Sequence, residues 1–329
     1  MTHNLAISYE DILSAATLLK GNSVQTPLLE NPNLNEAMGG RILIKPECLQ
    51  RTGSFKFRGA YNRLARLTDD EKERGVVAFS SGNHAQGVAY AAKLLKVPAI
   101  IVMPIDAPKL KMENTKAYGA KVITFDRYSE SREAIADQIS KETGAVVVPS
   151  FDDPHIMAGQ GTMGLEIAQS CLDLNIVPDQ VLINCGGGGL SSGSFLALVH
   201  HFSSLEGYVV EPVGYDDTKL SLETGVMQDA DITQKSICDA LLSPRPGKYT
   251  LEVLQHLKVK GLTVSDAEAL ETVAYCAREL KLTGEPGGVV SLAAVLKGKI
   301  PVKDKTTVVV ISGGNIDPAL LEKALSNYG

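Results

Sequence analysis

The chain has 329 residues, enough for two packed lobes, and its composition of 44% hydrophobic and 21% charged residues is typical of a soluble globular protein. A net charge of −6 and the lack of any basic run argue against nucleic acid as a partner. No apolar stretch approaches the roughly 20 residues that span a bilayer, so we expect no membrane partner. The five cysteines form no C-x-x-C pair and the N-terminal segment lacks a secretory pattern, so we expect free thiols and a cytoplasmic protein.

Short runs of β-branched residues alternate with longer segments of helical period along the chain. Most of the short runs are continuously apolar, as strands covered on both faces of a sheet are. In chain order we predict a helix at 9–20, strands at 41–45 and 76–79, a helix at 84–95, strands at 99–103 and 121–125, a helix at 130–143, a strand at 145–148, a helix at 157–174, strands at 181–184 and 208–210, a helix at 266–280 and a strand at 306–311. The pattern predicts an α/β fold with two lobes, each a mostly parallel twisted sheet flanked by helices.

The stretch from about residue 75 to residue 150 has the pattern of a compact βαβαβαβ unit. We therefore predict a small domain at 53–150, inserted between the two parts of a large domain at 1–52 and 151–329. In open parallel sheets, ligands bind at the carboxyl ends of the strands. The residues that follow each strand therefore carry the information about function.

Three predicted strands end in glycine-rich turns, at 80–84 (SSGNH), 186–190 (GGGGL) and 312–315 (SGGN). Glycine lets backbone N–H groups approach a ligand without a Cβ in the way. Four consecutive glycines followed by the helix-start residues Ser191 and Ser192 are typical of a nest of N–H groups that binds phosphate. The alternative is a set of tight turns that only pack helix on strand.

Common nucleotide-binding motifs do not explain these turns. The chain contains no G-x-x-x-x-G-K-[ST] pattern, and its one G-x-G-x-x-G, at 159–164, is separated from the preceding strand by FDDPHIMA. That match lacks the strand–turn–helix context of a dinucleotide site. The sequence therefore disfavours nicotinamide and flavin cofactors.

The segment GSFKFRGA at 53–60 resembles the serine/threonine dehydratase and serine racemase family of pyridoxal-phosphate enzymes (fold type II), in which the lysine of this motif carries the cofactor as a Schiff base. Further family motifs follow in the same order over nearly the whole chain: SSGNH, MPIDAPKLK at 103–111, AGQGT at 158–162, the tetraglycine loop, EP at 211–212 and SGGNID at 312–317. The resemblance implies pyridoxal 5'-phosphate as the cofactor and Lys56 as its anchor. A lysine whose pKa is lowered by its surroundings is suited to this role.

The resemblance also implies a role for the residues around the cofactor. Phe55 would cover one face of the ring, Asn83 would bond the ring hydroxyl, and Ser312 would meet the ring nitrogen. The phosphate would lie against the main-chain N–H groups of Gly186, Gly187, Gly188, Gly189 and Leu190. The substrate carboxylate would be bound by the turn made of Ser80, Ser81, Gly82, Asn83 and His84.

The implied activity is that of a dehydratase (ammonia-lyase) acting on a small amino-acid substrate, L-threonine, L-serine or a related β-hydroxy amino acid. Lys56 would remove the Cα proton, and loss of water would lead to a 2-oxo acid and ammonia. A neutral hydroxyl at Ser312 would make the ring a weaker electron sink, which suits β-elimination. The resemblance further implies a homodimer.

Other activities stay open. Ser81 matches the acid/base serine of the family's racemases and would be a second catalytic residue, whereas Phe79 stands where those racemases have a histidine. For 3-hydroxyaspartate, Arg132 would bind the second carboxylate; the alternative is a solvated side chain on a charged helix face. A phosphate-ligand binding protein without catalysis would explain the glycine turns but would leave Lys56 unexplained.

The segment E-P-x-x-x-D-D at 211–217 matches the place where the family binds a divalent cation. The resemblance implies a Mg2+ or Ca2+ site made of Glu211, the backbone carbonyl of Tyr215, and Asp217, since hard oxygen ligands suit these ions. The alternative is a group of exposed acids on a loop. One departure from the family is Ala240, which stands where a glycine is usual and adds a methyl group near the cofactor.

Overall fold

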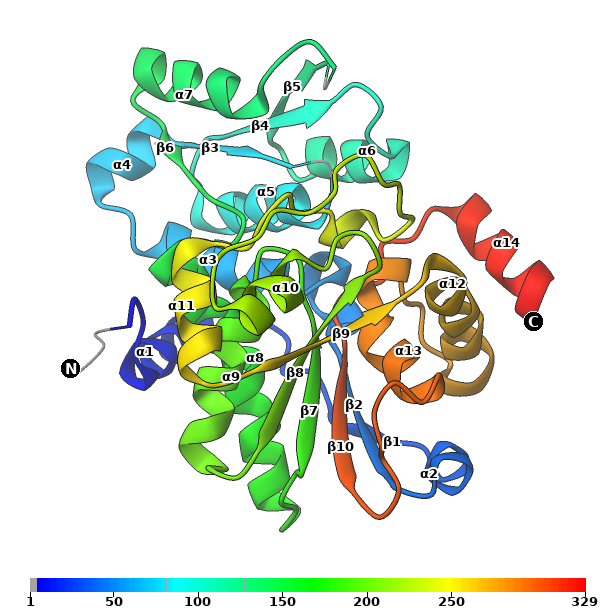
Figure 1. Cartoon of the computed structure of the whole chain (residues 1–329). Helices are drawn as coiled ribbons and strands as arrows, with labels where there is room; N and C mark the ends of the chain where they lie inside the picture. Colours follow the sequence, from blue (N-terminus) through cyan, green and yellow to red (C-terminus); the bar gives the residue numbers. More distant parts are fainter. Residues whose placement is uncertain (1–4, 81, 127) are drawn as a thin grey trace.

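The computed structural model describes residues 5–80, 82–126 and 128–329. Two separate sheets form the framework, and helices pack around both of them (Figure 1). Among the described strand pairs, all are parallel except the pair β1–β2. The predicted α/β fold with mostly parallel sheets is therefore confirmed.

The larger sheet has six strands in the order β1-β2-β10-β7-β8-β9. They are β1 (Leu29–Glu30), β2 (Arg41–Pro46), β7 (Gln180–Asn184), β8 (Glu206–Pro212), β9 (Lys260–Val264) and β10 (Thr306–Ile311). Strand β10 lies between β2 and β7, so that Val308 is opposite Leu43 on one side and Val181 on the other. Segments from the two ends of the chain therefore meet in the middle of this sheet.

The smaller sheet has four parallel strands in the order β5-β4-β3-β6. They are β3 (Val76–Phe79), β4 (Ala99–Pro104), β5 (Lys121–Phe125) and β6 (Val146–Val147). All four lie in the sequence between the two segments that build the larger sheet. The exact domain boundaries at residues 53 and 150 stay a prediction.

Helices flank both sheets. Those that follow or precede strands of the larger sheet are α1 (Tyr9–Leu19), α2 (Pro32–Met38), α8 (Pro154–Asp173), α9 (Gly189–His201), α10 (Asp217–Thr224), α11 (Lys248–His256), α12 (Asp266–Tyr275), α13 (Val290–Leu296) and α14 (Pro318–Tyr328). Those around the smaller sheet are α3 (Lys56–Ala65), α4 (Asp69–Arg74), α5 (Asn83–Leu95), α6 (Lys109–Ala117) and α7 (Arg132–Thr143). A short π-helix, Cys276–Leu280, continues α12.

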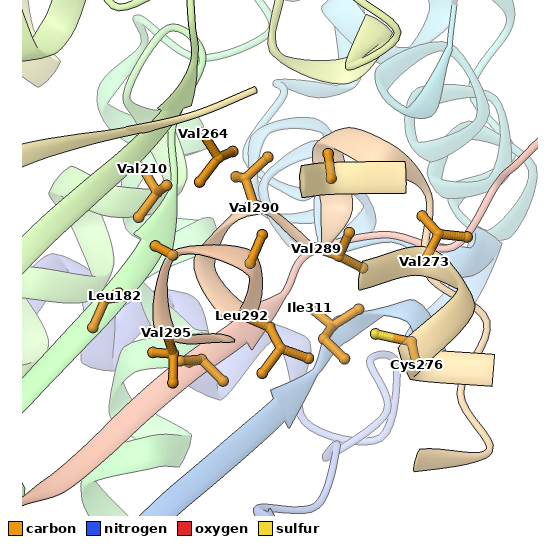
Figure 2. Close-up of a cluster of buried hydrophobic side chains, with 14 of the residues drawn as sticks. Leu182, Val210, Val264, Val273, Cys276, Val289, Val290, Leu292, Val295 and Ile311 are labelled. Atoms are coloured by element: carbon orange, nitrogen blue, oxygen red, sulfur yellow. The ribbon is translucent and has the colours of Figure 1, made fainter. Parts of the chain in front are cut away.

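Buried apolar side chains cover both faces of the larger sheet. On one face, Leu182 and Val210 pack with Val290 and Val295 of α13 (Figure 2). On the other face, side chains of α8 and α9 pack against the same strands. Burial on both faces explains why these strands are continuously apolar in the sequence rather than alternating.

Each predicted strand is present, with small shifts at its ends. The structure adds two edge strands, β1 and β9, which the sequence did not reveal. The helix predicted at 266–280 begins at the capping box of Ser265 and Glu268, but its regular α-helical part ends at Tyr275. The remaining residues to Leu280 form the π-helix.

The G-x-G-x-x-G pattern lies in the middle of α8 rather than at a strand end. An added Cβ at Gly161 would lie 2.8 Å from the carbonyl oxygen of Gly193, and one at Gly164 would lie 2.4 Å from that of Ser194, both in α9. These glycines therefore allow two helices to pack closely. This agrees with the conclusion that the pattern does not mark a dinucleotide site.

Two further observations concern the described part of the chain. No described helix is both long and apolar enough to cross a bilayer. The five cysteines are free thiols, and all except Cys48 are buried.

Candidate active site

A cavity of about 390 Å³ is lined by residues from both sheets. Among its lining residues are most of those predicted for the site: Phe55, Lys56, Ser80, Gly82, Asn83, His84, Gly186, Gly187 and Ser312. The chain segments that hold them follow strands β2, β3, β7 and β10, as expected for parallel sheets. Ser81 lies outside the described residues.

Lys56 is the first residue of α3, and its amine reaches into the cavity. Its Nζ donates a hydrogen bond to the carbonyl oxygen of Ser150 at 3.0 Å and lies 5.1 Å from the centre of the Phe55 ring. Within the described chain, no carboxylate forms an ion pair with this amine. Burial lowers the pKa of Lys56 to about 8, because removing water disfavours the charged form. Near neutral pH, a much larger fraction of this amine is therefore uncharged than of a lysine in water.

The tetraglycine loop connects β7 to α9 and presents backbone amides at a helix start. The amides of Gly187, Gly188 and Gly189 donate no hydrogen bond within the described chain. Gly187 has no room for a side chain, because an added Cβ would lie 2.3 Å from the Phe151 ring. Gly188 has a φ of +89°, a conformation that favours glycine. Unused amides at a helix N-terminus make this loop suited to binding a phosphate.

Asn83 is held by a network that the sequence analysis did not predict. Its Nδ2 donates to Glu285 Oε1 at 2.5 Å, and its Oδ1 accepts from Asn315 Nδ2 at 2.8 Å. Lys111 Nζ donates to Glu285 Oε2 at 3.3 Å and to Asp239 Oδ2 at 2.8 Å. Since Lys111 follows the smaller sheet's β4 while its two acidic partners lie among elements of the larger sheet, these ion pairs link the two sides of the cavity.

The pKa of Lys111 reflects this environment. Burial acts to lower it, but the carboxylates of Glu285 and Asp239 outweigh burial and raise the pKa above its usual value. Lys111 therefore keeps its positive charge beside the turn at 80–84, where an added Cβ at Gly82 would lie 3.3 Å from its Nζ. Lys111 also lines the cavity, where the two carboxylates that it pairs with balance its charge.

His84 and Ser80 shape the same turn. His84 is buried, its Nε2 lies 3.1 Å from the carbonyl oxygen of Val148, and its Nδ1 has no partner in the described chain. Burial, and then the nearby charge of Lys56, lower the pKa of His84 to about 3, so the ring is neutral. The Ser80 hydroxyl accepts a hydrogen bond from the Gly82 amide at 3.1 Å.

Ser312 follows β10 and faces the cavity from the side opposite the smaller sheet. Its carbonyl oxygen accepts a hydrogen bond from the Phe55 amide at 3.1 Å, and Ser54 forms an isolated β-bridge with Gly313. These bonds fix the lysine-bearing segment against the end of β10. The arrangement therefore places Phe55, Lys56 and Ser312 side by side at the cavity. The order of the motifs in the sequence does not reveal this contact.

Arg132, at the start of α7, lies at the same cavity. Its guanidinium is 5.3 Å from the centre of the Phe79 ring, and its Nε pairs with Glu133 at 2.8 Å. The side chain is exposed, as expected for a charged helix face, and it also lines the cavity that contains Lys56. An arginine in this position can bind a carboxylate of a ligand.

Glu211 and Asp217, predicted as metal ligands, are both buried, which rules out the alternative of exposed acids on a loop. The Glu211 carboxylate accepts hydrogen bonds from the amides of Thr218 and Lys219, and Asp217 Oδ2 has no partner in the described chain. Burial raises the pKa of Glu211 well above its usual value, and it raises that of Asp217 to about 7. Among the described residues, no group of three or more His, Cys, Asp or Glu side chains is arranged so that it could hold a metal ion.

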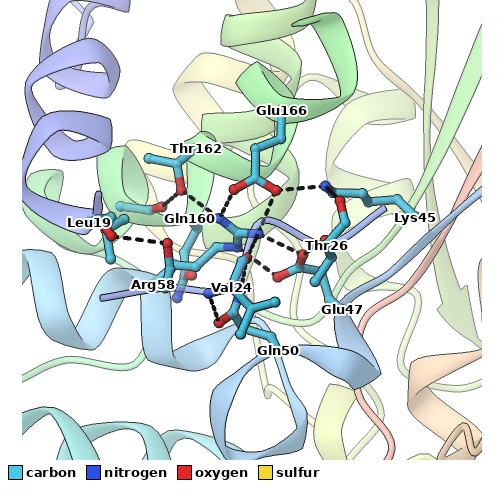
Figure 3. Close-up of polar contacts among 12 residues, drawn as sticks. Leu19, Val24, Thr26, Lys45, Glu47, Gln50, Arg58, Gln160, Thr162 and Glu166 are labelled. Atoms are coloured by element: carbon cyan, nitrogen blue, oxygen red, sulfur yellow. Dashed lines mark hydrogen bonds and ion pairs between the residues drawn. The ribbon is translucent and has the colours of Figure 1, made fainter. Parts of the chain in front are cut away.

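Beneath α3, a buried ionic network supports the lysine-bearing helix (Figure 3). Arg58, two residues after Lys56, pairs with Glu47 at 2.7 Å and with Glu166 at 2.6 Å. Lys45 pairs with Glu166 at 2.6 Å, and Thr26 donates to Glu47 at 2.6 Å. The network connects β2, α3 and α8, and so fixes the helix that begins at Lys56.

The residues of the cavity fit pyridoxal phosphate. A lysine amine with a lowered pKa, a loop with unused amides and an asparagine amide lie at one cavity, and these match an aldehyde, a phosphate and a ring hydroxyl. Lys56 would hold the aldehyde carbon, the tetraglycine loop the phosphate, and Asn83 and Ser312 the ring. The fold and the site thus define an α/β enzyme that holds a phosphate-bearing aldehyde on a lysine.

Comparison with known proteins agrees with this assignment of the fold and the cofactor. The pyridoxal-phosphate dependent enzyme family matches residues 20–313, and the chain belongs to this family. It is similar to serine racemase of Schizosaccharomyces pombe, at 39% identity over 96% of this chain and 97% of that protein, and to L-threo-3-hydroxyaspartate ammonia-lyase of Pseudomonas sp, at 40% identity over 94% and 96%. Among solved structures, it is similar to a T.th. threonine deaminase, with a TM-score of 0.88 and 38% identity over 94% of this chain and 99% of that one. The predicted fold type II resemblance is confirmed.

Proposed function

We propose that the chain is a dehydratase (ammonia-lyase) that converts L-threonine or L-serine into a 2-oxo acid and ammonia. The observation that carries the proposal is that the Lys56 amine, whose pKa is lowered by burial, lines the same cavity as the tetraglycine loop. The similarity to a threonine deaminase supports this substrate class. Overall, water is eliminated from the amino acid, and hydrolysis of the product releases ammonia.

Pyridoxal phosphate, when bound, supplies the electron sink that stabilises negative charge at the substrate Cα. The protein supplies the rest. The uncharged Lys56 Nζ accepts the Cα proton, and the carbonyl oxygen of Ser150 holds the resulting ammonium by a hydrogen bond. Main-chain amides of the 80–84 turn bind the substrate carboxylate.

Ser312 determines how strong the sink is. A hydroxyl can hold the ring nitrogen only by a hydrogen bond, whereas a carboxylate would also keep it protonated. The Ser312 side chain therefore favours a reaction in which a leaving group departs from Cβ, over one that needs a long-lived negative charge at Cα.

A second candidate substrate is 3-hydroxyaspartate. The observation that favours it is Arg132, whose guanidinium lines the cavity and is placed over the Phe79 ring. This guanidinium would form an ion pair with the second carboxylate of such a substrate. The similarity to an L-threo-3-hydroxyaspartate ammonia-lyase supports this candidate. Racemisation of serine depends on Ser81 as the base on the opposite face, and the similarity to a serine racemase keeps this activity as the alternative.

One assay separates these activities. The cofactor-loaded protein is mixed with L-threonine, L-serine, L-threo-3-hydroxyaspartate and their D-isomers, and 2-oxo acid and D-amino acid are measured together. We expect oxo acid from the L-isomers and none with Lys56→Ala. Excess D-serine over oxo acid would make the protein a racemase. A protein that only binds a phosphate ligand would show no visible absorbance that requires Lys56, whereas such absorbance without product would point to a substrate outside this panel.

We also propose a divalent cation, Mg2+ or Ca2+, at Glu211, the carbonyl of Tyr215, and Asp217. Two buried carboxyl groups with raised pKa values and an unpartnered Asp217 oxygen lack a compensating positive charge, which such an ion would provide. A chelator should lower the melting temperature of the loaded protein, and added Mg2+ or Ca2+ should restore it. Indifference to chelator would reject the site.

We make three further proposals, on the domain boundaries, the oligomeric state and the location of the protein. Residues 1–52 and 151–329 form the cofactor-binding domain, and residues 53–150 form a small domain. The protein is a homodimer, which sedimentation analysis tests. It acts in the cytoplasm, since all five cysteines are free thiols, as is usual in a reducing compartment.

A further inference from the structure

The tetraglycine loop is supported from behind by α11, an element without any predicted role. The Thr250 hydroxyl, fully buried, donates a hydrogen bond to the carbonyl oxygen of Gly187 at 2.7 Å. The Gly247 amide donates to the same oxygen at 3.1 Å. Both donors come from the start of α11, so this helix sets the direction of one peptide unit of the loop.

The direction of that peptide unit decides where its amide points. The chain has no cis peptide bond among the described residues, and in a trans peptide the C=O and the following N–H point in opposite directions. Because the Gly187 carbonyl points toward α11, the Gly188 amide points away from α11. The preceding residues of the loop, Gly186 and Gly187, line the cavity. That amide has no partner in the described chain.

The adjoining segment fixes α11 in place. The Asp152 carboxylate accepts hydrogen bonds from the amides of Lys248, Tyr249 and Thr250, at 3.0, 2.9 and 3.3 Å. Asp152 is two residues after Ser150, whose carbonyl oxygen binds the Lys56 amine. The segment 150–152 therefore contacts both the lysine and, through α11, the tetraglycine loop.

We infer that Thr250 is a positioning residue that turns the Gly188 amide toward the phosphate of the cofactor, with Asp152 holding α11 for this purpose. Neither side chain lines the cavity. The effect on the cofactor is thus indirect, through the orientation of a main-chain donor. The inference rests on the proposed cofactor site, but it is independent of which amino acid is the substrate.

Binding measurements without any substrate test this inference. Thr250→Val keeps the shape of the side chain and removes its hydroxyl, and Thr250→Ser keeps the hydroxyl. The Kd is measured for pyridoxal phosphate and for pyridoxal, which has the same aldehyde and ring but no phosphate. We expect Thr250→Val to raise the Kd for pyridoxal phosphate about tenfold, the size expected when one main-chain hydrogen bond to the charged phosphate is lost. We expect Thr250→Ser to bind as the unaltered protein does.

The comparison with pyridoxal is decisive, because a general structural defect would weaken the binding of both ligands. We expect the Kd for pyridoxal to stay within about twofold of the unaltered value, since the lysine and the ring contacts are unchanged. Equal weakening of both ligands, or unchanged binding of pyridoxal phosphate, overturns the inference. If Thr250→Val does not fold, Asp152→Asn provides a second test, because it weakens the hydrogen bonds that hold the start of α11. We again expect a higher Kd for pyridoxal phosphate and a nearly unchanged Kd for pyridoxal. Failure of pyridoxal phosphate to bind the unaltered protein would instead overturn the cofactor site itself.

Discussion

At the scale of single residues, the charge state of the Lys56 amine matters for the proposed attachment of the cofactor. Lys56 has its Nζ inside the cleft, bonded to a carbonyl oxygen rather than to a carboxylate. Burial without a compensating anion favours the neutral form. The reactivity of Lys56 therefore follows from the lack of an ion pair as much as from its position.

The first prediction concerns the rate at which cofactor-free protein takes up pyridoxal phosphate. Only the uncharged amine attacks the aldehyde, and the pKa of Lys56 is lowered from 10.5 to about 8. The neutral fraction, and with it the uptake rate, should rise as the pH increases through about 8. Stopped-flow absorbance at several pH values measures this rate, with Lys56→Ala as the control that shows no uptake. A rise centred near the usual lysine value would contradict the prediction.

The second prediction concerns Arg132 and the choice of substrate. If the guanidinium binds a second carboxylate, Arg132→Gln should lower kcat/KM for 3-hydroxyaspartate at least about tenfold and leave that for L-serine nearly unchanged. Lys109→Gln, which removes an exposed cation from the nearby α6, is the matched control for net charge. Equal losses on both substrates would show that Arg132 acts on the fold of the cavity instead.

Most of the residues predicted from the sequence lie in turns directly after strands, whereas Lys56, at the start of α3, was predicted from the motif around it. Their place follows from the direction of parallel strands, and the structure brings Lys56, Asn83, Gly186 and Ser312 to one cavity. The residues that were missed act through long-range pairing. Glu285, for example, is 174 residues from Lys111, and no local pattern joins them.

At the scale of elements, close packing of two helices forms a base for the tetraglycine loop, since α9 begins at that loop. Gly164 of α8 lies against the backbone of Ser194 in α9, and Gly161 lies against Gly193. This contact requires that α8 present no side chain at these positions. The loop's geometry therefore depends partly on α8, which contributes no lining residue to the cavity.

The third prediction is that Gly164→Ala destabilises the protein. In an open helix this change would be favourable by roughly 1 kcal/mol, because alanine is the better helix former. Here the added Cβ would lie 2.4 Å from the Ser194 oxygen, so we expect a loss of about 1–3 kcal/mol. Urea unfolding measures the change. Gln169→Ala, at an exposed position of the same helix, should have little effect, and a stabilised Gly164→Ala protein would refute the packing argument.

There are physical reasons why some elements leave only a weak pattern in the sequence. Strand β1 has only two residues, and β9 is a partly exposed edge strand with two charged or small residues at its start, Lys260 and Gly261. The end of α12 changes to a π-helix, which hydrophobic period does not distinguish from an α-helix. Buried central strands, in contrast, carry continuous apolar runs and were found.

At the scale of the whole molecule, one buried ionic network holds together segments distant in the sequence. Arg58 is fully buried and shares its guanidinium between Glu47 and Glu166. Burial opposes the charge of Glu47, but Arg58 outweighs it and holds the pKa of that carboxyl below its usual range. The stability that Glu47 contributes is therefore present at neutral pH and is lost as the pH falls through its lowered pKa.

The fourth prediction is that Arg58→Met costs about 3–5 kcal/mol of stability, because it leaves the fully buried Glu47 carboxylate without its arginine partner and Glu166 with Lys45 alone. Arg41→Met is the matched control: Arg41 also pairs with a glutamate, Glu30, but the pair is exposed. We expect its cost to stay within about 1 kcal/mol. Denaturant unfolding of the cofactor-free proteins measures both, and similar losses for the two variants would contradict the prediction.

The order of the larger sheet has a consequence for how the enzyme is made in the cell. Strand β10 lies between β2 and β7, and the turn that follows it supplies Ser312 and holds the Phe55 amide beside Lys56. The lysine is synthesised early, but the strand that completes its surroundings is translated only after nearly all the other elements. During translation the gap between β2 and β7 must stay open until β10 leaves the ribosome. We therefore expect cofactor capture to come late, after β10 has joined the sheet, and a ribosome-bound chain stalled before β10 should leave pyridoxal phosphate unbound.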